Sequence, residues 1–306
     1  MTPRPTILDG GMGRELLRIG APFRQPEWSA LALTEGPDRV VEAHRNFIDA
    51  GANVITSNSY AVVPFHIGAE RFASEGRSLA DTAGRLAREA ATGAHHEVRV
   101  AGSLPPLFGS YEPDLFDAAA APDIIDPLID GLHHHVDLWL AETLGSITEA
   151  YEVRRGLDRA GDTKRLWISY TLHRSDEGRI MSGESVADAT AAALDLGATA
   201  VLFNCSPAEM ITAAIRIAVA QAGTAAAVGG YANRFVAHHN EEVSAANDGL
   251  SRFRDDLDPA AYCEMADQWI DDGASIVGGC CGIEPAHIAA LAASVSRRSG
   301  SSSGGA

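Results

Sequence analysis

The residues best suited to chemistry are two adjacent cysteines near the end of the chain, Cys280 and Cys281. They follow a short apolar, β-branched run that is typical of a buried strand. Adjacent side chains on a strand point to opposite faces, so neighbouring thiols can converge only where the strand ends. Gly278, Gly279 and Gly282 flank the pair, and glycine tolerates the backbone angles that such an ending requires. Two converging thiols indicate ligands of a soft metal ion.

A third cysteine, Cys205, follows another predicted strand and could join the pair. Three thiolates with an open fourth position are typical of catalytic rather than structural zinc sites. Thiolates favour zinc or copper(I), and zinc brings no redox chemistry. Spacing alone leaves other interpretations open, because buried cysteines often behave as small hydrophobic side chains and adjacent cysteines can form a strained redox pair. We expect Cys263 to belong to the core.

Two carboxylates, Asp9 and Glu142, also come at the ends of predicted strands. An acid in this position either binds a cation or ammonium group, or caps the helix that follows. Asp9 precedes two glycines, and both roles remain open for it. Glu142 lies within an apolar run, which favours ligand binding over a place on the surface.

Short apolar runs alternate with longer amphipathic stretches along the whole chain, and these elements must position the cysteines and acids. We predict strands at residues 6–9, 53–59, 98–103, 138–143, 166–172, 200–204, 226–231 and 275–279. We predict helices at residues 38–50, 77–92, 124–134, 148–160, 186–196, 209–220, 259–271 and 285–297. Gly51, Gly197 and Gly273 are expected to end three of these helices.

This alternation predicts an α/β protein with a single (β/α)8, or TIM, barrel domain over residues 1–298. Residues 299–306 are nearly all Ser and Gly, which predicts a disordered tail. A doubly wound sheet is the alternative, but the turn at residues 9–13 lacks the spacing of a dinucleotide-binding loop. Catalytic groups of a barrel lie at the carboxyl ends of its strands, so Cys205 and the cysteine pair would share one rim.

The composition limits the partners of the chain. Its 306 residues carry a formal net charge of -17, which argues against nucleic acid as a partner. No apolar run reaches the roughly 18–20 residues of a membrane span, and the first residues lack the pattern of a signal peptide. Four cysteines, two of them adjacent, make a poor disulfide framework, so we expect a cytoplasmic protein. A monomer and a homo-oligomer are both compatible with the sequence.

Several short motifs, in this order and at these positions of a barrel, resemble the homocysteine S-methyltransferase family. This family comprises zinc-thiolate barrels and includes the S-methylmethionine- and betaine-dependent enzymes. The resemblance extends from about Thr6 to Leu291. Its motifs are ILDGGMG at residues 7–13, GANVITSNSY at 51–60, AET at 141–143, SGES at 182–185, FNCS at 203–206 and GGCCG at 278–282.

The resemblance implies a role for each candidate residue. It implies that Cys205, Cys280 and Cys281 bind Zn2+, and that Asp9 and Glu142 hold the ammonium group of homocysteine. The remaining implied positions are Gly10 and Gly11, whose amides would receive the carboxylate, Asn204, which would orient the site, and Trp28, near the methyl donor. An aromatic face at Trp28 would suit a sulfonium or quaternary ammonium cation.

The activity implied by the resemblance is zinc-dependent methyl transfer to the thiol of homocysteine, giving methionine, as in methionine biosynthesis. An onium donor is expected, S-methylmethionine first, with S-adenosylmethionine, betaine, a dimethylsulfonio compound or another thiol acceptor as alternatives. A non-catalytic zinc or thiol sensor and a metal-dependent barrel hydrolase or lyase are alternatives of other classes; the latter would need more ligands like His173. The chain departs from the family pattern at residues 102–111, at Tyr231-Ala232-Asn233 and at Gly282.

Overall fold

The computed structural model describes residues 4–236 and 252–301, which form one parallel barrel surrounded by helices. The strands are β1 (Thr6–Ile7), β2 (Val54–Thr56), β3 (Arg99–Leu104), β4 (Leu138–Leu144), β5 (Arg165–Tyr170), β6 (Ala200–Asn204), β7 (Ala227–Tyr231) and β8 (Ile276–Val277). They follow one another in the order β1-β8-β7-β6-β5-β4-β3-β2, and every pair is parallel. The bridge between Leu8 and Val54 joins the two ends of this order, with the Asn53 amide donating to Ile7 at 2.9 Å.

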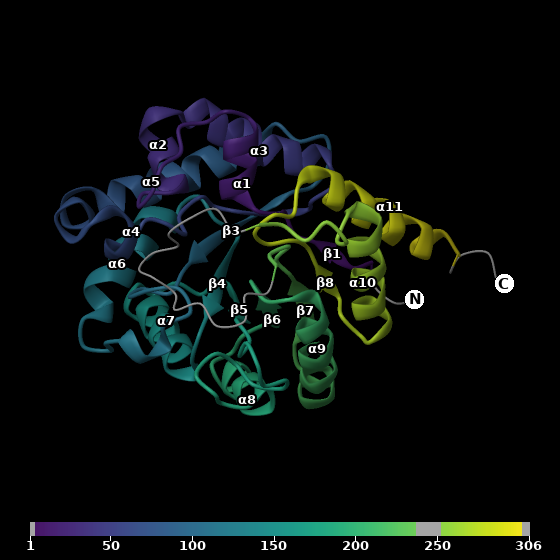
Figure 1. Ribbon diagram of the computed structural model, residues 1–306. Coiled ribbons are helices and arrows are strands. Elements are labelled where there is room, and N and C mark those ends of the chain that lie inside the picture. The colour runs from purple at the N-terminus through teal and green to yellow at the C-terminus, as the bar shows by residue number, and fades with distance from the viewer. Residues whose placement is uncertain (1–3, 237–251, 302–306) are drawn as a thin grey trace.

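In the described part of the chain, seven long helices connect consecutive strands, and an eighth follows β8; together they form the outer layer (Figure 1). They are α3 (Pro37–Asp49), α5 (Ala69–Thr92), α6 (Ala121–Leu132), α7 (Ile147–Arg159), α8 (Val186–Asp195), α9 (Ala208–Ala222), α10 (Pro259–Asp271) and α11 (Pro285–Ser301). Shorter helices lie in the loops: α1 (Met12–Arg18), α2 (Ala32–Glu35), α4 (Pro64–Ile67) and the 3₁₀ turns η1 (Ser29–Leu31) and η2 (Pro113–Leu115).

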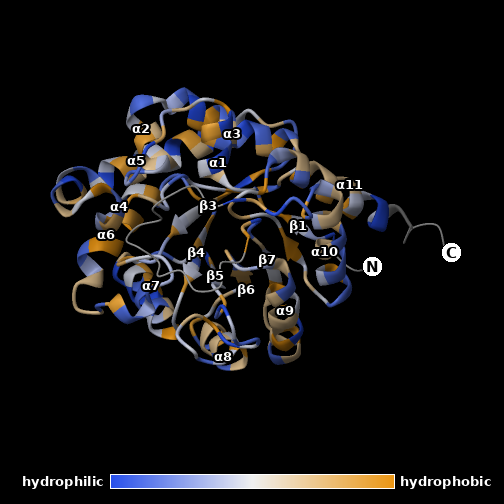
Figure 2. Ribbon diagram, viewed as in Figure 1, coloured by the Kyte–Doolittle hydropathy of each residue, from blue (hydrophilic) through white to orange (hydrophobic). Residues whose placement is uncertain are grey.

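Two apolar cores hold these layers together. The larger core lies between the strands and the helices, and each long helix turns its apolar stripe toward it (Figure 2). The smaller core fills the barrel interior and includes Leu140, Trp167 and Leu202. All seven residues of β4 are buried, as is typical of a strand in a parallel sheet that is covered on both faces.

The predicted (β/α)8 barrel is confirmed, and each of the eight predicted strands overlaps an observed one. Gly51, Gly197 and Gly273 have φ of 106°, 75° and 106°, as expected of glycines that end helices. Helix α5 begins at Ala69, eight residues before the predicted start, and the short loop helices were not predicted. Helix α11 continues to Ser301, and residues 302–306 of the expected tail lie outside the described residues.

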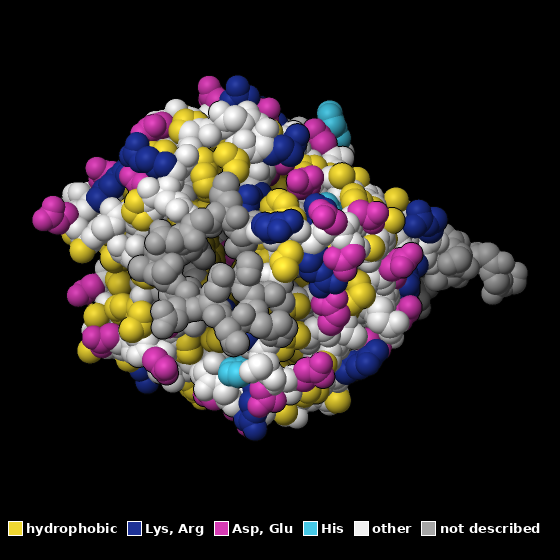
Figure 3. Space-filling model, in the orientation of Figure 1, with side chains coloured by type: hydrophobic (Ala, Val, Ile, Leu, Met, Phe, Trp, Pro, Cys, Tyr) yellow, Lys and Arg dark blue, Asp and Glu magenta, His cyan; other side chains and the backbone are white. Residues whose placement is uncertain are grey.

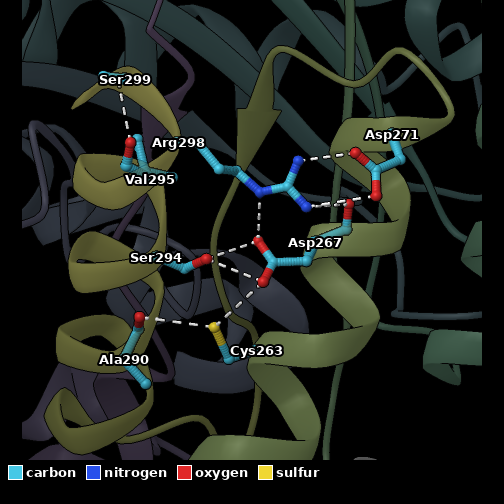
Figure 4. A network of polar contacts seen from close by, with 8 residues as sticks. All are labelled: Cys263, Asp267, Asp271, Ala290, Ser294, Val295, Arg298 and Ser299. Carbon is cyan, nitrogen blue, oxygen red and sulfur yellow. Dashed lines mark hydrogen bonds and ion pairs between the residues drawn. The ribbon is translucent and has the colours of Figure 1, made fainter. Parts of the chain in front are cut away.

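Helices α10 and α11 are joined by a polar network centred on Asp267 (Figure 4). Its carboxylate accepts hydrogen bonds from Ser294 Oγ at 2.8 Å and Arg298 Nε at 2.9 Å. Cys263 is buried beside it, and its thiol donates to the carbonyl of Ala290 at 3.5 Å. Cys263 therefore belongs to the helix packing, as expected. Among the described residues, no helix has the length and apolar character of a membrane span.

Candidate active site

The structure brings Cys205, Cys280 and Cys281 together at one end of the barrel. The Sγ atom of Cys281 lies 4.0 Å from that of Cys205 and 4.0 Å from that of Cys280, and all three lie within 4.8 Å of one another. Zn–S bonds of about 2.3 Å in tetrahedral geometry place sulfurs about 3.8 Å apart. The three thiols therefore fit zinc with little movement. In the described part of the chain, this is the one such cluster of three or more His, Cys, Asp or Glu ligands.

Close packing of glycines brings the cysteine pair that follows β8 next to the first strand. A Cβ on Gly278 would overlap Leu8, and one on Gly279 would overlap Ile283. Neither of these glycines has a positive φ, whereas Gly282 has φ of 82°. The expectation that all three supply unusual backbone angles is therefore right only for Gly282; the other two are needed because side chains of neighbouring segments fill the space.

The two acids line the same cavity as the three cysteines. Asp9 accepts hydrogen bonds from the Thr56 amide at 2.7 Å and the Thr56 hydroxyl at 3.0 Å. Glu142 accepts from Ser103 Oγ at 2.5 Å and from the Tyr231 hydroxyl at 3.3 Å. Burial raises the pKa of each acid to about 7, although these hydrogen bonds oppose the shift. The hydrogen bonds thus fix both carboxylates in position. Without a nearby cation, burial favours the neutral form of each acid.

An irregularity in β4 places Glu142 in the cavity. The register between β4 and β5 shifts between Ala141 and Leu144, and Thr143 adopts φ of 60°. Bulges of this kind often redirect a side chain beside an active site. The helix that follows, α7, begins with a capping box in which Ser146 and Glu149 bond each other's backbone amides. Glu142 therefore does not cap this helix.

The cavity has a volume of about 170 Å³, and residues with a strained backbone in the described part of the chain line it. Four non-glycine residues in the described part of the chain have a positive φ: Trp28, Tyr111, Thr143 and Cys205. All four line the cavity. A left-handed backbone is unfavourable for such residues and is concentrated at functional sites in proteins. Backbone strain thus marks the same place as the thiols and the acids.

Sequence reasoning assigned no role to two tyrosines of this cavity, Tyr60 and Tyr111. The Tyr111 hydroxyl lies 2.7 Å from Cys205 Sγ, and the Tyr60 hydroxyl lies 2.7 Å from Ser110 Oγ. Tyr111 ends the segment 102–111 that departs from the family pattern, so the departure itself was the available signal. The guanidinium of Arg174 lies 5.7 Å from the centre of the Tyr111 ring.

Two predicted site residues are placed differently from the cysteines and acids. Asn204 is fully buried, and its Oδ1 accepts from the Thr143 amide at 2.9 Å and Ser169 Oγ at 2.7 Å. It lies behind the wall of the cavity, with Nδ2 4.0 Å from Cys280 Sγ, so the structure gives it a supporting position. Gly11 lines the cavity, but its amide already donates to the Ile283 carbonyl at 2.9 Å.

Gly10 and Trp28 lie on the cavity wall, and their contact with a substrate stays a prediction. The Trp28 ring packs edge to face against Phe23, with 5.3 Å between the ring centres.

On the face of the molecule shown in Figure 3, acidic and basic side chains are interspersed, and the described residues of this face form no continuous basic patch.

The fold and the site together define a barrel enzyme built around a three-cysteine site for zinc. The chain belongs to the homocysteine S-methyltransferase family, whose model matches residues 6–295.

Its relatives include enzymes from plants and bacteria. It is 27% identical to homocysteine S-methyltransferase 1 of Zea mays, over 96% of this chain and 95% of the relative. It is 28% identical to the homocysteine S-methyltransferase of Escherichia coli (strain K12), over 94% of each chain. It is 27% identical to the selenocysteine Se-methyltransferase of Brassica oleracea var. italica, over 96% of this chain and 90% of the relative.

The structure is similar to that of the homocysteine methyltransferase MmuM from Escherichia coli in its metallated form. The two superpose with a TM-score of 0.79 and 25% sequence identity, over 96% of this chain and 97% of that chain.

Proposed function

We propose that the protein transfers a methyl group from an onium donor, S-methylmethionine first, to the thiol of homocysteine, giving methionine. The observation that carries the proposal is the presence of three converging cysteines and two buried acids in one cavity. A thiol amino acid has one group for each of these features, because its sulfur matches the thiolate cluster and its ammonium matches the acids. The sensor alternative gives the two acids no role.

Each residue then acts on a defined atom of homocysteine. When bound, zinc supplies a Lewis acid that allows a substrate thiol to react as its thiolate at neutral pH. Asp9 and Glu142 bind the substrate ammonium, which restores the ionised state that burial disfavours. Thr56, Ser103 and Tyr231 keep the two carboxylates in place through the hydrogen bonds described above. By holding the carboxylates, these three residues also fix the orientation of the bound substrate, and so the direction in which its sulfur faces the donor.

The methyl transfer itself requires no general base in the cavity, because the thiol releases its proton to solvent when its thiolate forms. The substrate sulfur forms a bond to the methyl carbon while the bond from that carbon to the onium sulfur or nitrogen breaks. The electron pair of the broken bond stays on the leaving atom, which becomes neutral. The acids and cysteines make the cavity negative, which favours a cationic donor, and the Trp28 ring offers a face for its charge.

A cytoplasmic location is part of the same proposal, since thiolate ligands must remain reduced in order to bind metal. Cys205, Cys280 and Cys281 are free thiols, with no disulfide among them.

The proposal is tested by assaying the zinc-loaded protein with homocysteine and, in turn, S-methylmethionine, S-adenosylmethionine and betaine. Methionine formation is expected to be fastest with S-methylmethionine. Selenocysteine and cysteine serve as competing acceptors, because selenocysteine Se-methyltransferases are among the relatives. Absence of methyl transfer to homocysteine from all three donors would contradict the proposal.

A further inference from the structure

One side of the cavity wall carries no charged side chain. Its lining residues come from positions 28–29 and 57–66, in the segments that follow β1 and β2, and none of them is Asp, Glu, Lys or Arg. We call this side the neutral wall. In the function proposed above, homocysteine occupies the cysteines and the acids, which leaves the neutral wall to the methyl donor. The polar end of the donor must then be recognised by uncharged groups.

Hydrogen bonds join the two segments of the neutral wall. Asn58 Nδ2 donates to the carbonyl of Ser29 at 2.9 Å. The ring of His66 forms a hydrogen bond with the backbone of Pro26, two residues before Trp28. Trp28 and His66 therefore belong to one continuous surface, although they come from different segments.

His66 is buried and fixed in this wall. It lies on helix α4 and is 3% exposed. The Phe65 ring packs edge to face against it, with 5.0 Å between the ring centres, and the centre of the Tyr60 ring lies 6.5 Å away. Burial lowers the pKa of His66 to about 4, so its imidazole is neutral at neutral pH.

The contact with Pro26 determines which nitrogen of His66 carries the proton. A proline has no backbone N–H, so its carbonyl accepts and the imidazole donates. The Nδ1 atom has no hydrogen-bond partner, and we therefore assign the donated proton to Nε2. Nδ1 is then an acceptor that is shielded from solvent and has no donor. Buried polar atoms in this state are unfavourable and rare in native proteins.

The indole of Trp28 leaves a second polar atom without a partner in the neutral wall. Its Nε1 is buried, makes no hydrogen bond and can only donate. The wall thus contains one unpaired donor and one unpaired acceptor. An α-amino acid group complements both, because its carboxylate accepts and its ammonium donates. A carboxylate alone would match Trp28 but would face the lone pair of His66.

We propose that His66 is a specificity-determining residue that selects a sulfonium donor with an α-amino acid group, by accepting a hydrogen bond at Nδ1 from the donor's ammonium. The inference rests on the proposed function and names the class of methyl donor. It favours S-methylmethionine, and S-adenosylmethionine as a compound with the same group, over betaine and dimethylsulfonio carboxylates, which have no N–H. Solvent does not reach Nδ1, so its partner arrives with the ligand.

The test compares S-methylmethionine with dimethylsulfoniobutanoate, the same molecule without its ammonium, in calorimetric titrations of the zinc-loaded protein. Homoserine in excess fills the acceptor position without offering a thiol to methylate. The wild-type protein is expected to bind S-methylmethionine at least about tenfold more tightly than the analogue, because hydrogen bonds to charged groups are among the stronger ones. His66→Leu should remove this preference by weakening the binding of S-methylmethionine alone.

Two further variants separate the two ring nitrogens. His66→Asn keeps an acceptor near the position of Nδ1 and should retain most of the preference. His66→Gln places its amide near the position of Nε2, which preserves the contact with Pro26, and it should lose the preference as His66→Leu does. His95→Leu changes an exposed histidine outside the cavity lining; it is the control and should leave both affinities unchanged.

Equal weakening of both ligands in His66→Leu, no change with either ligand, or a wild-type protein that does not prefer S-methylmethionine would overturn the inference. Methionine formation from homocysteine is assayed in parallel with each donor. If no donor supports methyl transfer while the binding preference still depends on His66, the proposed function fails and this inference stands. If methyl transfer proceeds and the preference does not depend on His66, the inference fails and the proposed function stands.

Discussion

The hydroxyl of Tyr111 lies 2.7 Å from Sγ of Cys205, so a side chain from the loop after β3 contacts the ligand that follows β6. Both residues have left-handed backbones, with φ of 67° and 52°. The contact therefore joins two residues with strained backbones that come from different loops. Hydrogen-bond donors to metal ligands orient those ligands and adjust their basicity.

Tyr111→Phe is expected to weaken zinc binding by roughly tenfold, because Cys205 loses its hydrogen-bond donor. The measurement is competition for zinc with a chromophoric chelator, which requires no enzymatic activity. Tyr151→Phe, whose ring is exposed on α7, is the control and should bind zinc like the wild-type protein. Unchanged zinc affinity in Tyr111→Phe would show that the hydroxyl has no part in holding the metal site.

As the pH rises, the affinity for methionine should increase and the stability of the unliganded fold should decrease. Burial raises the pKa of Asp9 and of Glu142 to about 7, from ordinary values of 3.8 and 4.5. A substrate ammonium binds the ionised acids, so we expect methionine affinity to decrease as the pH falls through about 7. The unliganded fold holds these acids more strongly protonated than the unfolded chain does, so its stability decreases as the pH rises from about 4 to about 7.

Calorimetric titrations with methionine and chemical unfolding, each carried out across this pH range, test both statements. Asp9→Asn should flatten the two profiles and weaken methionine binding. Asp158→Asn, on the outer surface of α7, should leave them as they are in the wild-type protein. An increase of methionine affinity toward low pH would be incompatible with the assigned role of the acids.

Trp28 should affect the donor but not the acceptor. Trp28→Leu is expected to raise the KM of S-methylmethionine by about threefold to thirtyfold, because a cation–π contact is lost. The KM of homocysteine should remain within about twofold, and Trp28→Phe should restore part of the donor affinity. Steady-state kinetics with each substrate varied in turn provide the measurement. A change confined to homocysteine would place Trp28 in the acceptor half of the cavity.

Asp267 should contribute more to stability than its neighbour Asp271. Asp267→Asn weakens hydrogen bonds from Ser294 and Arg298, and we expect it to lower the free energy of unfolding by about 1–2 kcal/mol. Asp271 pairs with the same arginine, but its side chain is 59% exposed, so Asp271→Asn should cost less than about 0.5 kcal/mol. Denaturant unfolding of the two variants compares them, and equal effects would contradict the importance of the half-buried network around Asp267.

The barrel and its cysteines could be predicted because both depend on local patterns. Apolar runs separated by amphipathic stretches are sufficient to predict eight β/α units, and the placement of Cys205 and Cys281 at strand ends follows from that arrangement. The start of α5 was predicted too late, because Gly76 and its polar neighbours weaken the helical pattern before Arg77. The Gly76 Cα packs against Phe72, which local propensity does not reveal.

The contributions of the loops to the site could not be predicted in the same way. Tyr111 reaches Cys205 because of a left-handed backbone, and no sequence pattern predicts a positive φ at a tyrosine. Arg14 lies on the cavity wall beside the rings of Phe235 and Phe253, which both follow it by more than two hundred residues in the chain. Contacts of this kind depend on the complete fold.

The most direct test of the account is zinc-edge X-ray absorption of the reduced, zinc-loaded protein before and after homocysteine is added. The account predicts three sulfur neighbours of zinc in the free protein and four with homocysteine, at about 2.3 Å. Cys281→Ser should lose zinc and methyl transfer together. A sulfur count that does not change on addition of homocysteine, or full activity in Cys281→Ser, would contradict the claim that the three cysteines hold the metal to which the acceptor thiol binds.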